Sequence, residues 1–364
     1  MPWPVPFTRL PSFIGREAQL DQLNAHISKE GCQPFHVCGL DGCRKTALAL
    51  ELFYRLKEQQ PSRAIFWLSA VSRESFEQAY GEIWILLNKP KILEDKADTM
   101  RLVKAILSDN TFGQLLLIVD NTDDTNVLLE PLGRERGTDR LIDFLPCSCK
   151  GSIIFTTRSE SMSIDLAGSN VLELGKLQKS EAKDVMKTPL VQKHRNQLED
   201  QKTVDEFLDI LAFLPLAIVQ AVAFINKNNS TISDYISLYR DSEQAAADLL
   251  STEFEDDNRR YGETKNPIAT TWYTSFEHIR KQNEDAAHLM CFMACTAHSD
   301  IPLSMLPVEG SKVQQAESIG MLKAYAFIIE RQSHKDSQHQ RDRSQRPAKA
   351  FDVHPLVHWQ CEAE

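Results

Sequence analysis

Four short and continuously apolar runs, separated by segments with helical periodicity, constrain the fold of this chain more than any other feature. The runs occupy residues 35–38, 64–68, 115–119 and 153–156. A strand that is apolar at every position is buried on both faces, as in a parallel sheet covered by helices on each side. The sequence therefore predicts an α/β domain, a parallel sheet with flanking helices, over residues 11–178. Residues 171–174 are expected to add a fifth strand.

The pattern changes beyond this domain. Apolar residues recur at helical spacing over residues 179–250, which predicts a small helical domain. Residues 251–265 are polar and charged, and we interpret them as a linker. Residues 266–360 begin with helical patterns and end in two strand-like runs around a polar segment, which predicts a winged-helix domain. The proline-rich residues 1–10 are expected to form an extended lead-in.

Composition restricts the partners and the compartment. The net charge of -10 disfavours broad binding to nucleic acid or to an anionic membrane. The basic residues in 334–349 are mixed with Gln, Ser and Asp, which favours a flexible wing tip over a DNA contact. No apolar run approaches the ~20 residues that span a bilayer, and no secretory signal is present. The 8 cysteines lack paired C-x-x-C spacing and indicate buried or incidental thiols. We therefore expect a cytoplasmic protein without membrane contact.

Residues 39–46, with the sequence GLDGCRKT, follow the first apolar run and precede a helical segment. They match the phosphate-loop pattern G-x-x-x-x-G-K-[ST] at Gly39, Lys45 and Thr46, and Gly42 is a further glycine within the loop. Glycines in such a loop let backbone N–H groups surround phosphate at a helix N-terminus. The lysine neutralises the outer phosphates, and the hydroxyl binds Mg²⁺. The segment predicts that these four residues bind a nucleotide.

Two residues of this loop depart from the pattern. Arg44 stands where the pattern has its last glycine, and Asp41 adds a negative charge. A Cβ at position 44 crowds a loop that often needs the backbone geometry of glycine. Arg44 and Asp41 could pair with each other, or Arg44 could bind phosphate through its forked donors. The alternative is a vestigial loop that keeps the fold without nucleotide.

The apolar run 115–119 ends at Asp120, which predicts a second Mg²⁺ ligand. A carboxylate at a strand end reaches Mg²⁺ through water or beside the hydroxyl of Thr46. Asn121 follows in place of a second acidic residue, so the usual position of a water-activating base is empty. Hydrolysis is therefore expected to be slow or absent. We interpret Asp123 and Asp124 as helix caps.

Taken in order, six segments resemble the motifs of NB-ARC proteins. These are STAND-type signalling NTPases that include plant disease-resistance receptors, apoptosome ATPases and their fungal relatives. The segments resemble the opening motif, the Walker A loop, the fungal form of Walker B, the sensor segment, the G-L-P-L-A motif and the winged-helix MHD motif. They are residues 13–17 (FIGRE), 39–46 (GLDGCRKT), 115–124 (LLLIVDNTDD), 151–158 (GSIIFTTR), 213–217 (FLPLA) and 351–357 (FDVHPLV).

The resemblance implies roles that spacing alone does not assign. The backbone around Ile14 and Arg16 would hold adenine, and Pro215 would lie near the same base. Arg158 would face the position of the γ-phosphate. His354 would contact the β-phosphate of ADP and lock a closed state.

Three residues depart from the family pattern. Phe213 replaces the glycine of the G-L-P-L-A motif. Val353 and Pro355 stand where the MHD motif has methionine and aspartate, which puts the structural role of that aspartate in doubt.

The resemblance implies a signalling switch that binds ADP or ATP with Mg²⁺, as in innate immunity. Three domains would close around ADP, and exchange for ATP would permit self-association or association with full-length NLR-like relatives. A different hypothesis is a nucleotide-free interaction scaffold that kept the fold. A third is an ATP-hydrolysing machine of the AAA type, against which the missing second acid and the predicted winged helix count. The effector and repeat domains usual in the family are not recognised in this sequence, so trigger and output cannot be inferred.

Overall fold

The computed structural model separates the chain into two compact units. The first comprises residues up to Gly175 except Leu40 and Gly42, which belong to the second unit with the residues from Lys176 onward. The structure describes residues 5, 7–10, 13–29, 31, 34–40, 42–87, 96–132, 139–158, 170–241, 249, 275–277, 279–296, 299–307, 310–325, 327–330 and 349–353.

The first unit contains a five-stranded sheet in which every neighbouring pair is parallel. Its order is β2-β3-β4-β1-β5, so β4 separates β1 from β3. All positions of β3 and β4 are buried, as their continuous apolar sequences require. The predicted parallel sheet and its fifth strand are confirmed. The strands are β1 (Pro34–Gly39), β2 (Ala64–Ser69), β3 (Leu115–Asp120), β4 (Gly151–Thr157) and β5 (Val171–Leu174).

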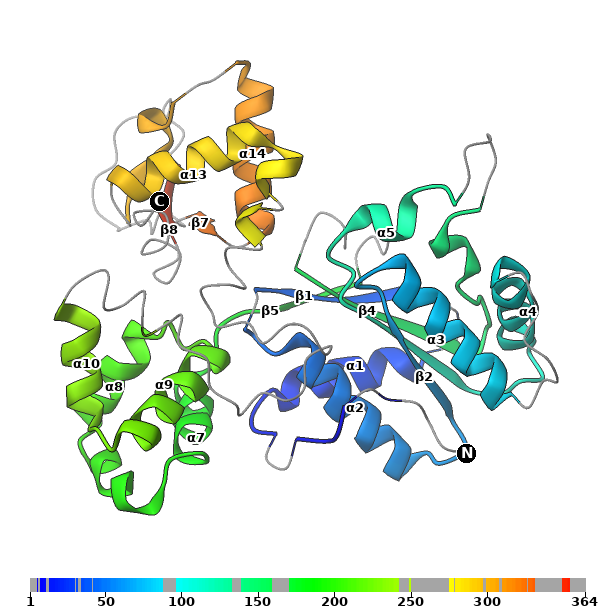
Figure 1. Cartoon of the computed structure of the whole chain (residues 1–364), viewed down its shortest axis with the longest axis horizontal. Coiled ribbons are helices and arrows are strands. Elements are labelled where there is room, and N and C mark those ends of the chain that lie inside the picture. Colours follow the sequence, from blue (N-terminus) through cyan, green and yellow to red (C-terminus); the bar gives the residue numbers. More distant parts are fainter. Residues whose placement is uncertain are drawn as a thin grey trace, which may run out of the picture. The chain divides into compact units, whose positions relative to one another are not determined.

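Helices flank this sheet, with α1 and α2 on one side and α3 and α4 on the other (Figure 1). On the α3 and α4 side, alternate residues of β2, β3 and β4 pack against both helices in one apolar core. This alternation follows from the period of two in a strand. The helical elements are α1 (Glu17–Ile27), α2 (Lys45–Gln59), α3 (Arg73–Leu86), α4 (Lys96–Ser108), α5 (Thr125–Leu129) and η1 (Leu141–Phe144).

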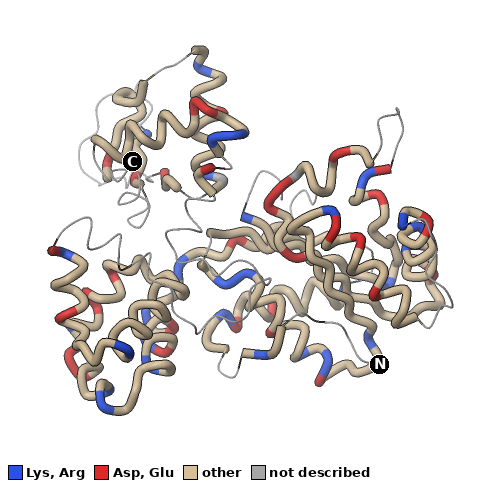
Figure 2. Tube along the Cα trace, in the orientation of Figure 1, with Lys and Arg blue, Asp and Glu red and all other residues tan. Residues whose placement is uncertain are grey.

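Charged side chains lie mainly on the helices and loops, and the strands of the first unit carry few of them (Figure 2). Within the five strands, Asp120 and Glu173 are the charged residues. Glu173 is exposed, whereas Asp120 is completely buried at the carboxyl end of β3. A buried carboxylate is costly unless it is hydrogen-bonded or holds a cation, so the place of Asp120 indicates a site.

The second unit contains α7 (Lys179–Lys187), η2 (Gln192–Glu199), α8 (Gln201–Ile210), α9 (Pro215–Asn228) and α10 (Ile232–Asp241). It also contains a sheet of order β6-β8-β7 with antiparallel pairings. The elements around this sheet are α13 (Glu284–Thr296), β6 (Ile301–Pro302), η4 (Leu303–Met305), α14 (Lys312–Ala324), β7 (Ile328–Glu330) and β8 (Ala350–Val353).

Several sequence predictions fall on residues that the structure does not describe. They concern Asp41, the linker 251–265, the polar tip 334–349 and His354 with Pro355. Among the described helices, none has the length and apolarity that crossing a membrane requires.

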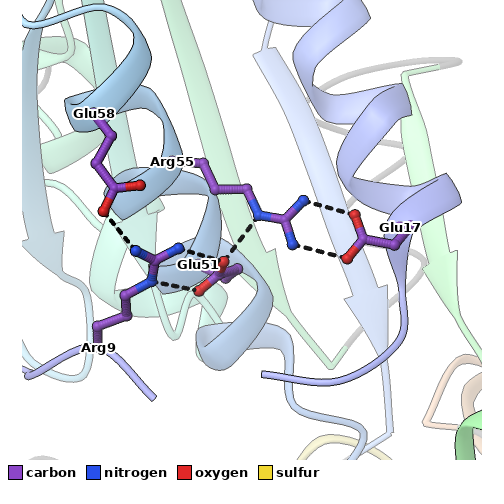
Figure 3. Close-up of polar contacts among 5 residues, drawn as sticks. All are labelled: Arg9, Glu17, Glu51, Arg55 and Glu58. Carbon is purple, nitrogen blue, oxygen red and sulfur yellow. Dashed lines mark hydrogen bonds and ion pairs between the residues drawn. The ribbon is translucent and has the colours of Figure 1, made fainter. Parts of the chain in front are cut away.

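An ion-pair network attaches the N-terminal segment and α1 to α2 (Figure 3). Arg9 donates two hydrogen bonds to the carboxylate of Glu51, at 3.1 and 2.9 Å, and one to Glu58 at 2.6 Å. Arg55 donates to Glu51 at 2.9 Å and to both oxygens of Glu17 at 2.6 and 2.8 Å. Glu51 lies at the centre, because its buried carboxylate receives both guanidinium groups. The network fixes the start of α1 and residue 9 on the helix that follows the phosphate-loop sequence.

Apolar contacts strengthen the attachment of the N-terminal segment. The ring of Phe7 is buried and meets Trp67 of β2 edge to face, with ring centroids 6.2 Å apart. The hydroxyl of Tyr54 on α2 donates to the carbonyl of Phe7 at 3.1 Å. The described part of the predicted lead-in is therefore packed against the first unit.

The substitution Glu51→Gln should lower the free energy of unfolding by about 1–2 kcal/mol, because it removes a buried charge that two arginines share. Burial raises the pKa of Glu51, but hydrogen bonds from Arg9 and Arg55 outweigh it and hold the pKa below the ordinary value. The control Glu58→Gln removes an exposed partner of Arg9 and should change stability by less than about 0.5 kcal/mol. Urea unfolding of both variants measures the difference. Equal effects would contradict a central role for Glu51.

The buried His36 of β1 should make stability depend on pH. Its ring stacks on Phe155 at 4.6 Å between centroids, and neither ring nitrogen has a hydrogen-bond partner among the described residues. Burial lowers the pKa of His36 from 6.5 to about 4. The unfolded chain therefore binds this proton first as the pH falls, and stability is lost as the pH falls from about 6.5 toward 4.

From these values, His36 should cost about 2 kcal/mol of unfolding free energy between pH 7 and pH 5. The substitution His36→Leu should remove this part of the pH dependence while keeping an apolar side chain in the core. Urea unfolding of the natural chain and the variant at both pH values measures it. An unchanged pH slope in His36→Leu would show that the ring is not the source.

Candidate functional site

The residue at the end of β1 must be glycine. An ideal Cβ placed on Gly39 would lie 2.5 Å from the carbonyl oxygen of Leu174, on the neighbouring strand β5, and 3.0 Å from the Sγ of Cys43. A real Cβ does not approach a backbone oxygen so closely. The bare backbone of Gly39 therefore lets β1 pass β5 and enter the loop that leads to α2.

The departure from the phosphate-loop pattern at Arg44 has a definite structural consequence. Arg44 is the N-cap of α2 and has a left-handed backbone, with φ 69° and ψ 42°. This conformation costs a non-glycine residue on the order of 1 kcal/mol. The expected conflict at position 44 is therefore real, but arginine adopts the backbone of a glycine instead of changing the loop. Gly42 also has a positive φ, of 82°.

The predicted cation and Mg²⁺ ligands lie close together at this edge of the sheet. The Nζ of Lys45 donates to the carbonyl oxygen of Gly39 at 2.7 Å, so the lysine folds back over its own loop. The hydroxyl of Thr46 donates to the Oδ1 of Asp120 at 3.0 Å. The hydroxyl of Thr156 on β4 donates to the same oxygen. The buried carboxylate of Asp120 is thus stabilised by two hydroxyl groups from different elements.

The loop after β3 is tied to the end of β4. Asn121 has a left-handed backbone, with φ 65°, and its N–H donates to the Thr156 hydroxyl at 2.9 Å. The N–H and hydroxyl of Thr122 donate to the Thr156 carbonyl at 2.9 and 3.0 Å. The hydroxyl of Thr157 donates to the carbonyl of Thr122 at 3.1 Å. These bonds fix the loop between β3 and α5 beside the residues that follow β4.

Arg158, the predicted sensor, pairs with Asp123 in this loop. The Nε of Arg158 lies 2.7 Å from Oδ2 of Asp123, and the backbone N–H of Arg158 donates to Oδ1 at 2.7 Å. Asp124 is the N-cap of α5, and its carboxylate accepts from the N–H of Asn126 at 2.9 Å. The helix-cap interpretation is therefore confirmed for Asp124 and wrong for Asp123. Asp123 points to Arg158 because the tight Asn121–Thr122 turn brings it to the end of β4.

The residues of the opening motif lie at the other side of β1. Gly15 and Arg16 both have positive φ values, of 76° and 65°, and Arg16 is the N-cap of α1. The guanidinium of Arg16 is buried and donates to the carbonyl of Gly175, directly after β5. Ile14 is half-buried. The turn before α1 is thereby held at the carboxyl end of β5.

Pro215 and Gly42 belong to the second unit. Pro215 is the first residue of α9, where its fixed φ suits a helix and its missing N–H costs nothing. The N–H of the next residue, Leu216, donates to the carbonyl of Gly42 at 3.2 Å. The middle of the phosphate-loop sequence is therefore hydrogen-bonded to the start of α9. His354 lies outside the described residues.

The residues present fit a phosphate group with Mg²⁺. Phosphate binds where backbone N–H groups at a helix N-terminus are not covered by side chains. Here α2 begins at Lys45, Gly39 tolerates no side chain, and an ammonium and a hydroxyl follow. The hydroxyl of Thr46 and the carboxylate of Asp120 supply the oxygen ligands that Mg²⁺ prefers. The edge of the sheet where strand order reverses is also where α/β folds bind ligands.

The chain has a clear relative among known proteins. It is 39% identical over 363 residues to a protein of Hyaloscypha variabilis called a nucleotide-binding leucine-rich repeat (NLR)-like protein. The alignment covers 97% of this chain but 35% of the relative, so the chain spans about a third of the relative's length. No protein-family model matches the chain.

Solved structures establish the fold. A Walker-type ATPase of Pyrococcus abyssi superposes with a TM-score of 0.57, covering 98% of this chain and 97% of its own, at 9% identity. The first unit has a P-loop NTPase fold. The Cdc6p protein of Pyrobaculum aerophilum has a TM-score of 0.42 at 14% identity, over 96% of this chain and 94% of its own, which carries no inference.

Two residues of this site were not predicted from the sequence. Thr156 orients Asp120 and also the turn at Asn121, and Asp123 holds Arg158. The signal for Thr156 was its place one residue from the end of an apolar run, where a polar residue faces the carboxyl edge. No sequence signal distinguished Asp123 from Asp124, because both follow the strand as neighbouring carboxylates.

The left-handed backbone at position 44 gives a direct stability prediction. Arg44→Gly and Arg44→Ala both remove the guanidinium, so they differ only in the Cβ. The glycine variant should be more stable by about 1 kcal/mol, although alanine is the more stable choice at a right-handed position. Denaturant unfolding of the two variants measures this difference. A more stable alanine variant would show that the backbone at position 44 is not left-handed in solution.

Proposed function

We propose that this chain is an adenine-nucleotide-binding signalling switch of the NB-ARC type with weak or no hydrolysis. The observation that carries the proposal is the backbone of the loop after β1, which keeps its tight geometry despite Arg44 and places Lys45, Thr46 and Asp120 together. The name of the Hyaloscypha variabilis relative, an NLR-like nucleotide-binding protein, supports the same assignment.

In the proposed site, Gly39 and Gly42 present backbone to the phosphates and Lys45 neutralises their outer charge. Thr46 and Asp120 hold Mg²⁺, which supplies charge neutralisation between phosphate oxygens when bound. To bind phosphate, Lys45 must leave the Gly39 carbonyl, a neutral partner that a charged phosphate replaces favourably. Ile14, Arg16 and Pro215 are assigned to the adenine by resemblance.

Weak hydrolysis follows from the carboxylates of the β3 loop. Asn121 cannot act as a base, and Asp123 is already engaged by Arg158 through both of its oxygens. Asp124 caps α5. In the described part of this loop, each carboxylate after Asp120 therefore has a structural partner. A residue that positions and deprotonates water has no evident source there.

The second unit is assigned to the response of the switch. We assign the helices from α7 to α10 to the helical domain, and α13, α14 and the β6-β8-β7 sheet to the winged helix. His354, directly after the described end of β8, would contact ADP in the closed state. Nucleotide can shift such an equilibrium only by its different affinities for the two states. Self-association or association with NLR-like relatives, in the cytoplasm, would follow opening.

A nucleotide-free scaffold is the second candidate function. It is favoured by the arginine at the strained position 44 and by the internal pairing of Lys45 with Gly39. Restoring glycine at positions 41 and 44 separates the two. Under the scaffold hypothesis the double variant gains nucleotide binding that the natural chain lacks, whereas a functional switch binds nucleotide without it.

The test is the nucleotide content of the purified natural chain, followed by thermal unfolding with added ADP or ATP and Mg²⁺. A switch should release near-stoichiometric ADP on denaturation, and nucleotide at 100 times its Kd should add about 2.7 kcal/mol of stability. Lys45→Ala should abolish both effects, whereas the control Lys57→Ala at the far end of α2 should keep them. An empty chain with no nucleotide-dependent stabilisation would favour the scaffold.

A further inference from the structure

The pair formed by Asp123 and Arg158 is more than a surface ion pair. Both side chains are largely buried, with 17% and 19% of their surface exposed. Asp123 is fixed at two points, since Oδ2 meets Nε of Arg158 and Oδ1 accepts the backbone N–H of the same residue, each at 2.7 Å. Such a partly buried and doubly bonded pair is costly to open, because opening leaves both charges incompletely paired.

This pair lies at the edge of the sheet that carries the phosphate loop. The register of β1 and β4 places Cys38 opposite Thr157, so Arg158 follows at the level of Gly39. The Sγ of Cys38 donates to the carbonyl of Arg158 at 3.6 Å. Arg158 is therefore a cation at the start of the phosphate loop, and the carboxylate of Asp123 is its partner in this state.

We infer that Asp123 sets the selectivity of this site between nucleoside diphosphate and triphosphate by holding Arg158. The inference rests on the proposed function. A triphosphate brings an additional charged group for which Arg158 is the available guanidinium, and Asp123 competes with that group for the same donors. A diphosphate lacks the group and binds with the ion pair intact. Asp123 thus lowers the affinity for triphosphate without an equal effect on diphosphate, and acts as a positioning residue.

Asp124 supplies a charge-matched control. It is the next residue in the chain and carries the same charge, but its carboxylate caps α5 through the N–H of Asn126. Asparagine is as good an N-cap as aspartate, so Asp124→Asn removes one charge and keeps the cap. Asp123→Asn also removes one charge while retaining an oxygen that can accept the Arg158 N–H. The two variants have the same net charge and differ in which carboxylate is lost.

The experiment measures the Kd of ADP and of a non-hydrolysable ATP analogue, each with Mg²⁺, by isothermal titration calorimetry on the full chain. Asp123→Asn should shift the ratio of the two constants toward the triphosphate by about tenfold, the loss of one charge-assisted interaction. Asp124→Asn should leave the ratio within about twofold. Asp123→Glu, which can still reach Arg158, should restore the natural ratio.

Arg158→Gln tests whether the effect passes through the arginine. In that background, adding Asp123→Asn should no longer change the ratio. If Asp123→Asn does not fold, Asp123→Ser replaces it, because serine also accepts an N–H without carrying charge. A natural ratio in the Asp123 variant, or equal shifts in the Asp123 and Asp124 variants, overturns the inference while leaving the proposed function intact. Failure of the natural chain to bind either nucleotide overturns both.

Discussion

At Gly39 the backbone of β1 passes so close to the carbonyl of Leu174 that no side chain fits between the two strands. This close approach of β1 and β5 fixes where the loop begins, and the loop then has few ways to reach the start of α2. Its last step requires a left-handed residue before Lys45, which the chain provides with Arg44. The arrangement of Lys45, Thr46 and Asp120 depends on that path, since all three are placed by the ends of β1, α2 and β3.

The polar groups at this edge already have partners within the chain. Lys45 is bonded to a carbonyl, Thr46 and Thr156 share Asp120, and Arg158 is paired with Asp123. Such internal satisfaction keeps a buried polar region stable in the absence of a ligand. It also means that binding is an exchange of partners, so the free energy of binding is a difference between two well-bonded states. The strength of each internal bond then becomes a property that tunes the site.

Much of the first unit could be predicted from the sequence, because continuous apolar strands and phosphate-loop spacing are local signals. The strand order could not, since nothing local indicates that β4 inserts between β1 and β3. The pairing of Asp123 with Arg158 joins residues 35 apart, and that of Arg9 with Glu51 joins residues 42 apart. Side-chain pairs at such separations depend on the assembled fold, so periodicity does not reveal them. Arg44 could be recognised as a departure, but only its backbone angles show how it is accommodated.

The N-terminal segment has a mechanical consequence. Phe7 is held by Trp67 and Tyr54, and Arg9 is bonded to Glu51 and Glu58 on α2. A force applied to the chain ahead of residue 5 would therefore reach α2 before any strand of the sheet. Because α2 begins at Lys45, the first unit behaves as a lever whose handle is the N-terminal segment and whose short arm ends at the phosphate loop.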